Sequence, residues 1–415
     1  MIPISEALKI IERETFLLGA ETVDLENSSG RVLAEDIFAD MDLPPFDRSQ
    51  MDGFAVRVED VAKASKEHFV KLKIIGESVA GKGFNGKINA GQTVRIMTGA
   101  RLPKGADAVQ KKELARESAD GKSVEIFEAV KPNQHFIVRA SEIKKGEKVL
   151  EKGEIINARM TAILAAFGYA KIRVFKKPKV SILATGSEIV EISDVPQADQ
   201  IRDSNSASLK SFAEEAGAIV KVLPRTKDDF ENLRTQIAAI VGLNGESRIQ
   251  NPESEILILS GGVSVGDYDF TKPALREIGA QIFFEKVALR PGKPTVFARL
   301  NDCLIFGLPG NPVSVAVTFY LFVRRAILQM QGAKDCELKC GFAILSEKIK
   351  GAKERDSYLP AKLNFQDAGK LSAAPLRWGG SSDFVSFAKA DCLIFVPRDK
   401  IIEAGRIVEI IFLPR

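Results

Sequence analysis

The spacing of hydrophobic residues at the start of the chain predicts a helix followed by strands. Apolar residues recur at intervals of three and four over residues 4–18, with Ser5 as the expected N-cap and Glu6 in the first turn. Strand-like runs follow at residues 21–25 and 32–38. The N-terminal segment is therefore predicted to be a mixture of helix and strand.

Two β-rich segments lie farther along the chain. Residues 54–140 contain short apolar runs, frequent glycines and no long helical period, which predicts an inserted β-barrel-like domain. A helix is expected over residues 158–167, ended by Gly168, and a second β-rich segment follows residue 331. Changes in composition place the domains at residues 1–42 with 141–176, 43–140, 177–330 and 331–415.

Between residues 178 and 330, strand-like and helical runs alternate, as in a parallel sheet with crossover helices. Strands are expected at residues 180–185, 218–225, 255–260, 281–289, 295–300 and 303–309, and helices at 205–217, 229–241, 272–278 and 312–330. In such sheets, ligands bind beyond the carboxyl ends of the strands. The loops that follow these strands are therefore the first candidates for a functional site.

One of these loops follows the buried run 256–259. Its first residues, Gly261 and Gly262, allow backbone N–H groups to approach a phosphate or another anion, since no Cβ stands in the way. Asp267 and Asp269 come next, where a Mg²⁺ ion could bridge the protein and a phosphate. For this stretch alone, the alternative is a strand, a turn and two solvated acids.

Two other strand-end loops have a similar character. Residues 184–188 follow one strand, and residues 307–314 lead into the long helix, whose N-terminus attracts anions. Between prolines 291 and 294 stands Lys293, whose backbone is restricted so that its ammonium group can be aimed at an anion. Three such loops with a fixed cation predict an oxyanion or phosphate site.

Composition and charge limit the remaining possibilities. The chain has 415 residues, is 45% apolar and carries a net charge of +4, with no Lys/Arg run long enough to bind nucleic acid. Its cysteines at positions 303, 336, 340 and 392 do not complete a zinc set, so reduced thiols in a cytoplasmic protein are expected. The N-terminus is unlike a signal peptide, and the apolar run 313–323 is too short to span a bilayer.

Several motifs also point to a family when they are taken in order. They are PPFDRSQMDGFAV at 44–56, RIMTGARLPKGADAV at 95–109, ILATGSEIV at 182–190 with QIRDSN at 200–205, SGGVSVGDYDFTK at 260–272, RPGKPTVF at 290–297 and FGLPGNPVSVAVTF at 306–319. Together they resemble the MoeA and gephyrin E-domain family, the molybdopterin molybdenumtransferases, over essentially the whole chain.

The resemblance implies a multidomain α/β plus β fold. It would consist of a molybdopterin-binding α/β domain, an inserted β-barrel-like domain, an elongated helical and β domain, and a C-terminal β-barrel. The implied reaction inserts molybdate into adenylylated molybdopterin, gives the molybdenum cofactor and AMP, and is assisted by Mg²⁺. The expected catalytic residues are Asp52, Asp228, Asp267, Asp269 and Lys293, and the expected metal ligands are Asp267, Asp269 and Glu188. The expected substrate contacts are Thr98, Thr185, Gly186, Ser187, Glu188, Gly261, Gly262, Ser264, Arg290, Pro294, Pro309, Asn311, Pro312, Ser314, Arg355, Ser381 and Ser382.

The family also implies a homodimer in which Asp52 and Thr98 complete the active site of the other subunit. The upstream adenylyltransferase is a further candidate partner. Without the resemblance, Asp52 would be an ordinary turn aspartate, Thr98 part of a hairpin loop, and residues 378–383 a turn beside a packed indole. The sequence departs from the family at Glu142, where an aspartate is common, and at Pro360, where a second arginine is common.

Two other functions remain open at this point. One is adenylylation of molybdopterin, because the enzyme of that step resembles residues 178–330 only. The other is a non-catalytic scaffold that binds molybdopterin or the finished cofactor. The extra β domains and the loops at 51–53 and 98–100 argue against the first of these alternatives.

Overall fold

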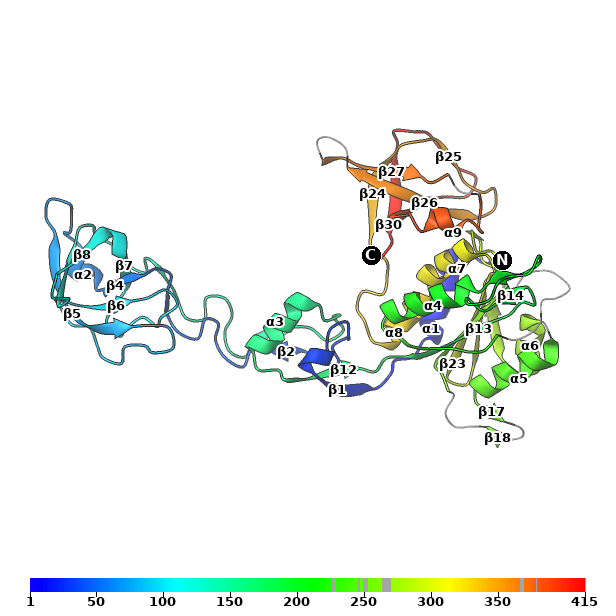
Figure 1. The fold of residues 1–415 in the computed structure, drawn as a ribbon, viewed down its shortest axis with the longest axis horizontal. Coiled ribbons are helices and arrows are strands. Elements are labelled where there is room, and N and C mark those ends of the chain that lie inside the picture. Colours follow the sequence, from blue (N-terminus) through cyan, green and yellow to red (C-terminus); the bar gives the residue numbers. More distant parts are fainter. Residues whose placement is uncertain are drawn as a thin grey trace. The chain divides into compact units, whose positions relative to one another are not determined.

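The computed structural model describes residues 1–225, 229–244, 247–248, 253–262, 270–365, 369–377 and 379–414. The chain forms two compact units (Figure 1). The larger unit contains Met1–Glu35, Lys152–Ala158 and Lys171–Arg415. The smaller unit contains Asp36–Glu151 and Arg159–Ala170.

A six-stranded sheet forms the centre of the larger unit, in the order β16-β13-β19-β23-β22-β20. Its strands are β13 (Lys179–Ala184), β16 (Ile219–Val222), β19 (Ile256–Ser260), β20 (Gln281–Phe284), β22 (Val296–Leu300) and β23 (Cys303–Leu308). The first four in the order are parallel, whereas β22 and β20 are antiparallel to their neighbours. The prediction of a parallel sheet is therefore wrong at this edge. Only Asn301 and Asp302 join β22 to β23, and so short a connection permits only an antiparallel pair.

Helices cover both faces of this sheet. They are α4 (Ser204–Glu215), α5 (Phe230–Ile240), α6 (Thr271–Glu277), α7 (Pro312–Thr318) and α8 (Arg324–Met330), with a π-helical turn, η3 (Phe319–Val323), between the last two. Successive residues of a strand point to opposite faces, so Ile256 and Ile258 of β19 pack in one hydrophobic cluster and Leu257 and Leu259 in the other. Both faces are thus buried, which explains the continuous apolar run of β19.

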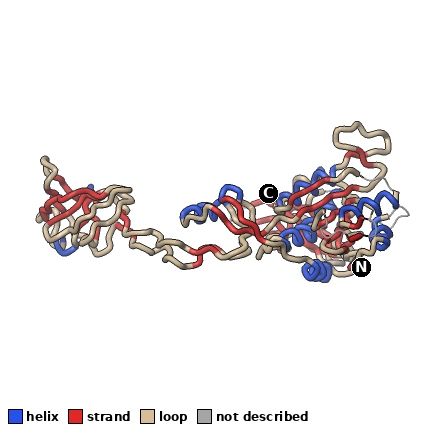
Figure 2. The backbone as a smooth tube through the Cα atoms, turned by 90° about the horizontal axis from the view of Figure 1, so that it is seen from below, coloured by secondary structure: helices blue, strands red, loops and turns tan. Residues whose placement is uncertain are grey.

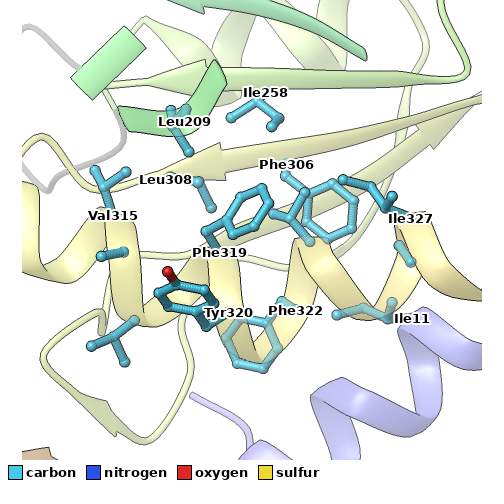
Figure 3. Packing of buried hydrophobic residues seen from close by; sticks show 14 of the residues in the cluster. Ile11, Leu209, Ile258, Phe306, Leu308, Val315, Phe319, Tyr320, Phe322 and Ile327 are labelled. Atoms are coloured by element: carbon cyan, nitrogen blue, oxygen red, sulfur yellow. The ribbon is translucent and has the colours of Figure 1, made fainter. Parts of the chain in front are cut away.

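The helix that starts at Pro312 is the main element of the hydrophobic cluster that contains Ile256 and Ile258. Its Phe319, Phe322 and Ile327 are fully buried beside Phe306 of the sheet (Figure 3). By length and composition the 19 residues Pro312–Met330 could cross a membrane, and this helix is longer than the apolar run 313–323 that the prediction considered. The helix continues beyond the apolar run 313–323, and 78% of its most apolar window is buried. It is therefore a core helix of this unit.

The N-terminal part of the chain packs on the same unit. Helix α1 spans Ile4–Glu14, and strand β1 (Ala20–Asp24) pairs with β12 (Lys171–Phe175). The expected N-cap Ser5 is wrong, because the helix begins earlier and Pro3 is the N-cap, without a side-chain hydrogen bond. The predicted strand at 32–38 is reduced to isolated bridges and the two-residue strand β2 (Ile37–Phe38).

The C-terminal segment folds into a closed β-barrel, as predicted. Its strands are β24 (Cys340–Leu345), β26 (Asp356–Phe365), β27 (Leu371–Pro375), β28 (Cys392–Val396) and β30 (Ile407–Phe412). The order β26-β27-β24-β30-β28 closes because β28 also pairs with β26. The two-residue strand β21 (Leu289–Arg290) begins at the last residue of the predicted strand 281–289, but it pairs with β26 instead of continuing β20. The chain therefore changes sheets within that segment.

Strands dominate the smaller unit (Figure 2). Its main sheet has the order β7-β4-β6-β5-β9-β8, formed by β4 (Gly53–Val56), β5 (Val70–Ser78), β6 (Gln92–Ile96), β7 (Ala108–Lys111), β8 (Ala115–Glu117) and β9 (Ser123–Ile126). Short pairs β2 with β11 (Lys148–Leu150) and β3 (Arg48–Ser49) with β10 (Phe136–Ile137) accompany it. Helix α3 (Ala158–Ala166) ends where predicted, with Gly168 at a φ of 74°.

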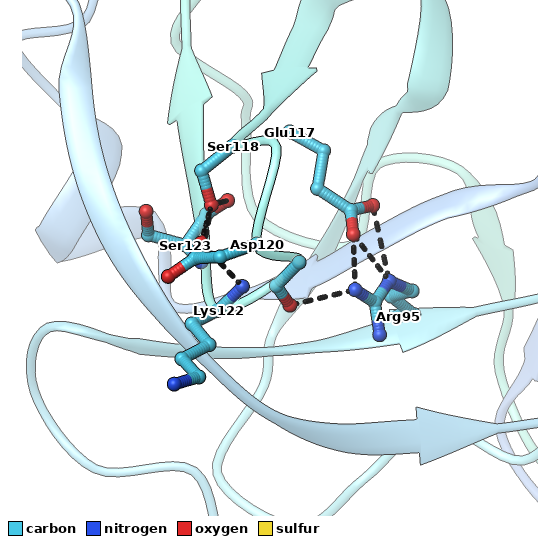
Figure 4. A network of polar contacts seen from close by, with 7 residues as sticks. Arg95, Glu117, Ser118, Asp120, Lys122 and Ser123 are labelled. Atoms are coloured by element: carbon cyan, nitrogen blue, oxygen red, sulfur yellow. Dashed lines mark hydrogen bonds and ion pairs between the residues drawn. The ribbon is translucent and has the colours of Figure 1, made fainter.

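The main sheet of the smaller unit is curled. Arg95 of β6 forms an ion pair with Glu117 of β8, and its guanidinium also donates to the carbonyl of Gly121 over 2.7 Å (Figure 4). Three strand spacings of about 4.8 Å separate β6 from β8 in a flat sheet, so curling brings these side chains together. The edge strands β7 and β8 do not pair with each other, and every residue of this sheet is described. It is an incompletely closed, barrel-like sheet.

Candidate active site

The larger of two adjoining cavities lies beyond the carboxyl ends of β13, β19 and β23. Its volume is about 960 Å³. The residues that line it are Thr185, Gly186, Glu188, Ile189, Pro196, Gln200, Ile201, Arg202, Asp203, Ser204, Asn205, Ser260, Gly261, Gly262, Pro294, Pro309, Gly310, Asn311, Pro312, Ser382 and Phe384. All three predicted loops therefore meet in one cavity, as expected where the carboxyl ends of parallel strands are neighbours.

Close backbone approach explains one glycine of this wall, and a positive φ explains another. Gly261 has a φ of 92°, and a Cβ there would lie 2.5 Å from the carbonyl oxygen of Thr185. Gly186 has a φ of 146°, and a Cβ there would lie 2.6 Å from a carboxylate oxygen of Glu188. Another residue at Gly261 would have to displace the Thr185 backbone, whereas at Gly186 the Glu188 side chain could move and the backbone φ is what favours glycine. Gly261 thus keeps two loops close together at the cavity wall.

Asn205 holds three segments of the larger cavity together. It is the second residue of α4, and its amide nitrogen donates to the carbonyl of Gly310 over 2.7 Å and to the hydroxyl of Ser260 over 3.1 Å. A carbonyl can only accept, so the atom that faces Gly310 is the amide nitrogen. Sequence reasoning missed Asn205 as a site residue, although it ends the QIRDSN motif. Only the fold shows that it reaches two other loops.

Unpaired polar atoms lie in the same wall. The Thr185 hydroxyl and the Asn205 Oδ1 atom are buried and have no hydrogen-bond partner among the described residues. Buried polar atoms usually have a partner, and leaving one unpaired costs about 1–3 kcal/mol. These atoms are the kind of orphaned groups that a polar ligand can satisfy.

A second cavity of about 640 Å³ adjoins the first and is lined by cationic and hydroxyl side chains. The residues that line it are Arg290, Pro291, Gly292, Lys293, Pro294, Pro309, Asn311, Ser314, Arg355, Gly379, Gly380 and Ser381. It shares Pro294, Pro309 and Asn311 with the first. Pairing of β21 with β26 brings Arg290 beside Ser357, so Arg355, just before β26, lies on the same cavity. This register was not visible in the sequence.

The loop 379–383 of the C-terminal barrel is fixed to the start of α7. The carbonyl of Ser381 accepts from the N–H of Val313 over 3.0 Å, and its hydroxyl accepts from the Asn311 amide over 2.8 Å. The Asp383 carboxylate accepts N–H groups of Gly379 at 2.9 Å and Ser386 at 3.0 Å, which hold the pKa of that carboxyl below its ordinary value. Both cavities are therefore completed by the barrel.

Asp52 and Thr98 lie together in the smaller unit. The backbone N–H of Thr98 donates to the Asp52 carboxylate over 2.7 Å, and its hydroxyl donates to the same oxygen over 2.8 Å. These two hydrogen bonds lower the pKa of Asp52, which is exposed. The two predicted residues are thus a single hydrogen-bonded pair, held as a carboxylate at neutral pH.

Part of the predicted site lies outside the described residues. Asp228, Ser264, Asp267, Asp269 and the indole of Trp378 lie outside the described residues. Among the described residues, no cluster of three acidic, histidine or cysteine side chains could hold a metal ion. Of the predicted metal ligands, Glu188 alone is described, and it lines the larger cavity.

The remaining predicted positions lie in several places. Ser187 is exposed and lines neither cavity. Glu142 lies in the smaller unit, where its N–H bonds to the carbonyl of Leu43. Pro360 is buried in β26 opposite Leu393, within the barrel wall. The four cysteines are free thiols.

Comparison with known proteins identifies the family. Over 411 residues, which are 99% of this chain, it is 35% identical to a molybdopterin molybdenumtransferase of Staphylococcus aureus (strain COL) and covers 95% of that protein. The chain belongs to the molybdopterin molybdenumtransferase family of molybdenum cofactor biosynthesis. A relative of the same name from Staphylococcus epidermidis is 36% identical over the same length. The relatives are transferases, and the alternatives of adenylyltransferase and scaffold are not favoured.

Family models match the molybdenumtransferase fold along the chain. They are the MoeA N-terminal region (domain I and II) over residues 2–168, the probable molybdopterin binding domain over 181–329 and the MoeA C-terminal region (domain IV) over 343–413. Two solved structures, titled as molybdopterin biosynthesis MoeA proteins from Pyrococcus horikoshii, are similar to it. One is 31% identical with a TM-score of 0.80, each chain covering 99% of the other, and one is 29% identical with a TM-score of 0.81 and full coverage of both. The predicted family and fold class are confirmed.

Proposed function

We propose that this protein inserts molybdate into adenylylated molybdopterin and releases AMP and the molybdenum cofactor. The observation that supports this most directly is the pair of adjoining cavities, one lined by glycine loops and the other by cations, which share Pro294, Pro309 and Asn311. The reaction brings a small dianion to a large nucleotide-linked pterin. Two cavities with a common wall are suited to such a pair of substrates.

The smaller cavity is assigned to molybdate. Arg290, Lys293 and Arg355 supply positive charge, and Ser314, in the first turn of α7, adds a hydroxyl beside the helix N-terminus. A tetrahedral dianion is stabilised by cations and by N–H and O–H donors. These groups therefore bind and orient molybdate, and they offset its charge as it approaches the pterin.

The larger cavity is assigned to the adenylylated pterin. Its backbone at Gly186, Gly261 and Gly262 carries no side chain, so a diphosphate can approach the main-chain N–H groups. Thr185 and Asn205 present buried polar atoms that have no partner among the described residues. AMP then leaves from this cavity after the phosphoanhydride bond is broken.

Mg²⁺ is part of the proposal. Carboxylate oxygens are the ligands this ion prefers, and it usually takes only one or two from the protein together with substrate phosphates. Glu188 fits this requirement, because its carboxylate lines the cavity assigned to the diphosphate. Asp267, Asp269 and Asp228 remain the other proposed ligands. When bound, the ion would neutralise charge on the phosphoanhydride.

The deciding experiment is a turnover assay with purified protein, adenylylated molybdopterin, Mg²⁺ and increasing molybdate. We expect release of AMP and formation of cofactor, both dependent on molybdate. When a cavity charge is removed, as in Lys293→Ala, the matched control is Lys348→Ala, which removes an exposed lysine paired with Glu403. Tight pterin binding without AMP release would refute the proposed transferase activity.

A homodimer with shared active sites is also proposed, with the upstream adenylyltransferase as a candidate donor of the intermediate. The Asp52–Thr98 pair would complete the site of the second subunit. Inactive Asp52→Ala and Asp269→Ala variants should then regain part of the activity when they are mixed, because mixed dimers contain one intact site. A monomer by light scattering, or mixtures with no recovery, would argue against the shared site.

A further inference from the structure

We propose that Phe384 and Ile201 form the two apolar walls of a slot for a planar heteroaromatic ring, which is either the pterin or the adenine of the substrate. This inference rests on the proposed function, since that function supplies the two rings. It adds a specificity-determining role for two side chains that were not among the predicted site residues, although Ile201 stands in the QIRDSN motif. Phe384 comes from α9 (Phe384–Phe387) of the C-terminal segment, and Ile201 from β15 (Ile201–Arg202) of the α/β domain.

The exposure of these two side chains is what needs explanation. Phe384 is 50% exposed and Ile201 is 60% exposed, and both line the larger cavity. Single exposed apolar residues are common on protein surfaces and do not by themselves indicate a binding site. Val385, next to Phe384 in the sequence, is 63% exposed, and Ile192, two residues after β14, is 61% exposed, but neither lines the cavity. What distinguishes Phe384 and Ile201 is that two separate parts of the fold present them to one cavity.

The backbone that carries each side chain is held in place by described contacts. The residues before Phe384 are anchored, because Asp383 caps α9 and the Ser381 carbonyl accepts from the N–H of Val313. Ile201 is held by pairing of β15 with β14 (Ile189–Val190), where it lies opposite Ile189. An anchored backbone pre-organises the positions of these walls, so a ligand loses little free energy in ordering the backbone.

The chemistry of the slot selects a flat, electron-delocalised ligand. Much of the rest of the cavity wall consists of glycines, hydroxyls and amides, which suit phosphate and sugar groups. Among the described residues of that lining, Phe384 is the one aromatic residue. Purine and pterin rings have π-faces that stack on aromatic side chains, and an aliphatic side chain can cover the opposite face. Molybdate and phosphate gain nothing from these two walls.

The test measures binding by calorimetry with three probes: AMP, 6-hydroxymethylpterin phosphate and ribose 5-phosphate, which has no ring to stack. We expect Phe384→Ala to weaken binding of one of the two ring-bearing probes by about tenfold, because stacking on one aromatic side chain contributes that much. Ile201→Ala should weaken binding of the same probe through the loss of apolar contact. Phe384→Leu should lose less affinity for that probe than Phe384→Ala. Binding of ribose 5-phosphate should not change. Val385→Ala and Ile192→Ala are the matched controls and should leave the affinity for all three probes unchanged.

The outcomes separate the two rings and the two proposals. A loss confined to AMP assigns the slot to adenine, and a loss confined to the pterin probe assigns it to pterin. Equal losses for AMP and ribose 5-phosphate would mean that the loop had shifted, which would overturn the stacking role. Unchanged affinities in a Phe384→Ala variant, with normal molybdate-dependent turnover, would also overturn it and leave the proposed function intact. A wild-type protein that binds neither ring-bearing probe but shows molybdate-dependent turnover would overturn the slot and leave the proposed function intact, whereas absence of turnover as well would refute both proposals.

Discussion

The hydrogen bonds of Asn205 give the sharpest test of how the larger cavity is organised. Asn205→Ala removes the donor to the Gly310 carbonyl at 2.7 Å and to the Ser260 hydroxyl at 3.1 Å. Each hydrogen bond contributes about 0.5–1.5 kcal/mol net, so the pair contributes about 1–3 kcal/mol. Both acceptors line the cavity, and a ligand would have to restore their arrangement. We therefore expect the dissociation constant for AMP to rise by about 5-fold to 150-fold.

Asn205→Asp separates the role of the donor from that of side-chain volume. The carboxylate has nearly the same size but directs an oxygen at the Gly310 carbonyl, which also accepts only. Binding of AMP should therefore be at least as weak as in Asn205→Ala. The matched control is Asn232→Ala, because Asn232 donates a similar bond of 2.8 Å to Asp229 at the start of exposed helix α5. Calorimetry of AMP binding is the assay. Wild-type affinity in Asn205→Asp would refute the reasoning.

Three further predictions concern charge and thiol chemistry. Lys293→Ala should raise the molybdate concentration for half-maximal turnover by about threefold to tenfold, since an exposed charge is partly screened, whereas Lys348→Ala should not change it. The pKa of Asp383 is lowered below its ordinary value of 3.8. The ionised carboxylate therefore stabilises the loop 379–386 at any pH above 3.8, and this stabilisation is lost as the pH falls through the lowered pKa. Amide hydrogen exchange at Gly379 and Ser386 should accordingly be faster in Asp383→Ala at neutral pH, and equal rates would contradict the assignment. Burial raises the pKa of the Cys392 thiol to about 12, so in a thiol titration of the native protein at pH 8 the exposed Cys340 should react first and Cys392 only on unfolding.

The alternation of strands and helices in the α/β domain was predictable because it depends on local periodicity. The buried run 256–259 became β19, and the helix expected at 229–241 became α5 with Asp229 as its N-cap. Glycine positions were equally informative. Gly261 and Gly186 have left-handed φ values in loops that had been chosen from their composition. Such features follow from a few neighbouring residues, so a single sequence contains the information.

Strand direction and sheet membership were less predictable. The antiparallel pair β22–β23 follows from a two-residue connection that is visible in the sequence. The prediction of a parallel sheet overlooked it, because that prediction was based on the alternation of strands and helices over the whole domain. The change of sheet at Leu289–Arg290 has no local signal, because it depends on a partner strand that begins at Asp356. The N-cap at Pro3 differed by two residues from the expected Ser5, which is a common error at helix ends.

The sequence by itself determined which residue types could take part in the site and to which family the chain belongs. Glycines, hydroxyls, Lys293 and Asn311 stand in motifs whose chemistry can be read in order along the chain. Only the tertiary structure decided which of them share a cavity. Arg290 and Arg355 meet through a pairing between strands, Asn205 joins loops more than fifty and one hundred residues away, and Phe384 reaches the cavity from the C-terminal segment. These contacts are long-range, and their energies arise from packing and hydrogen bonds that no local pattern contains.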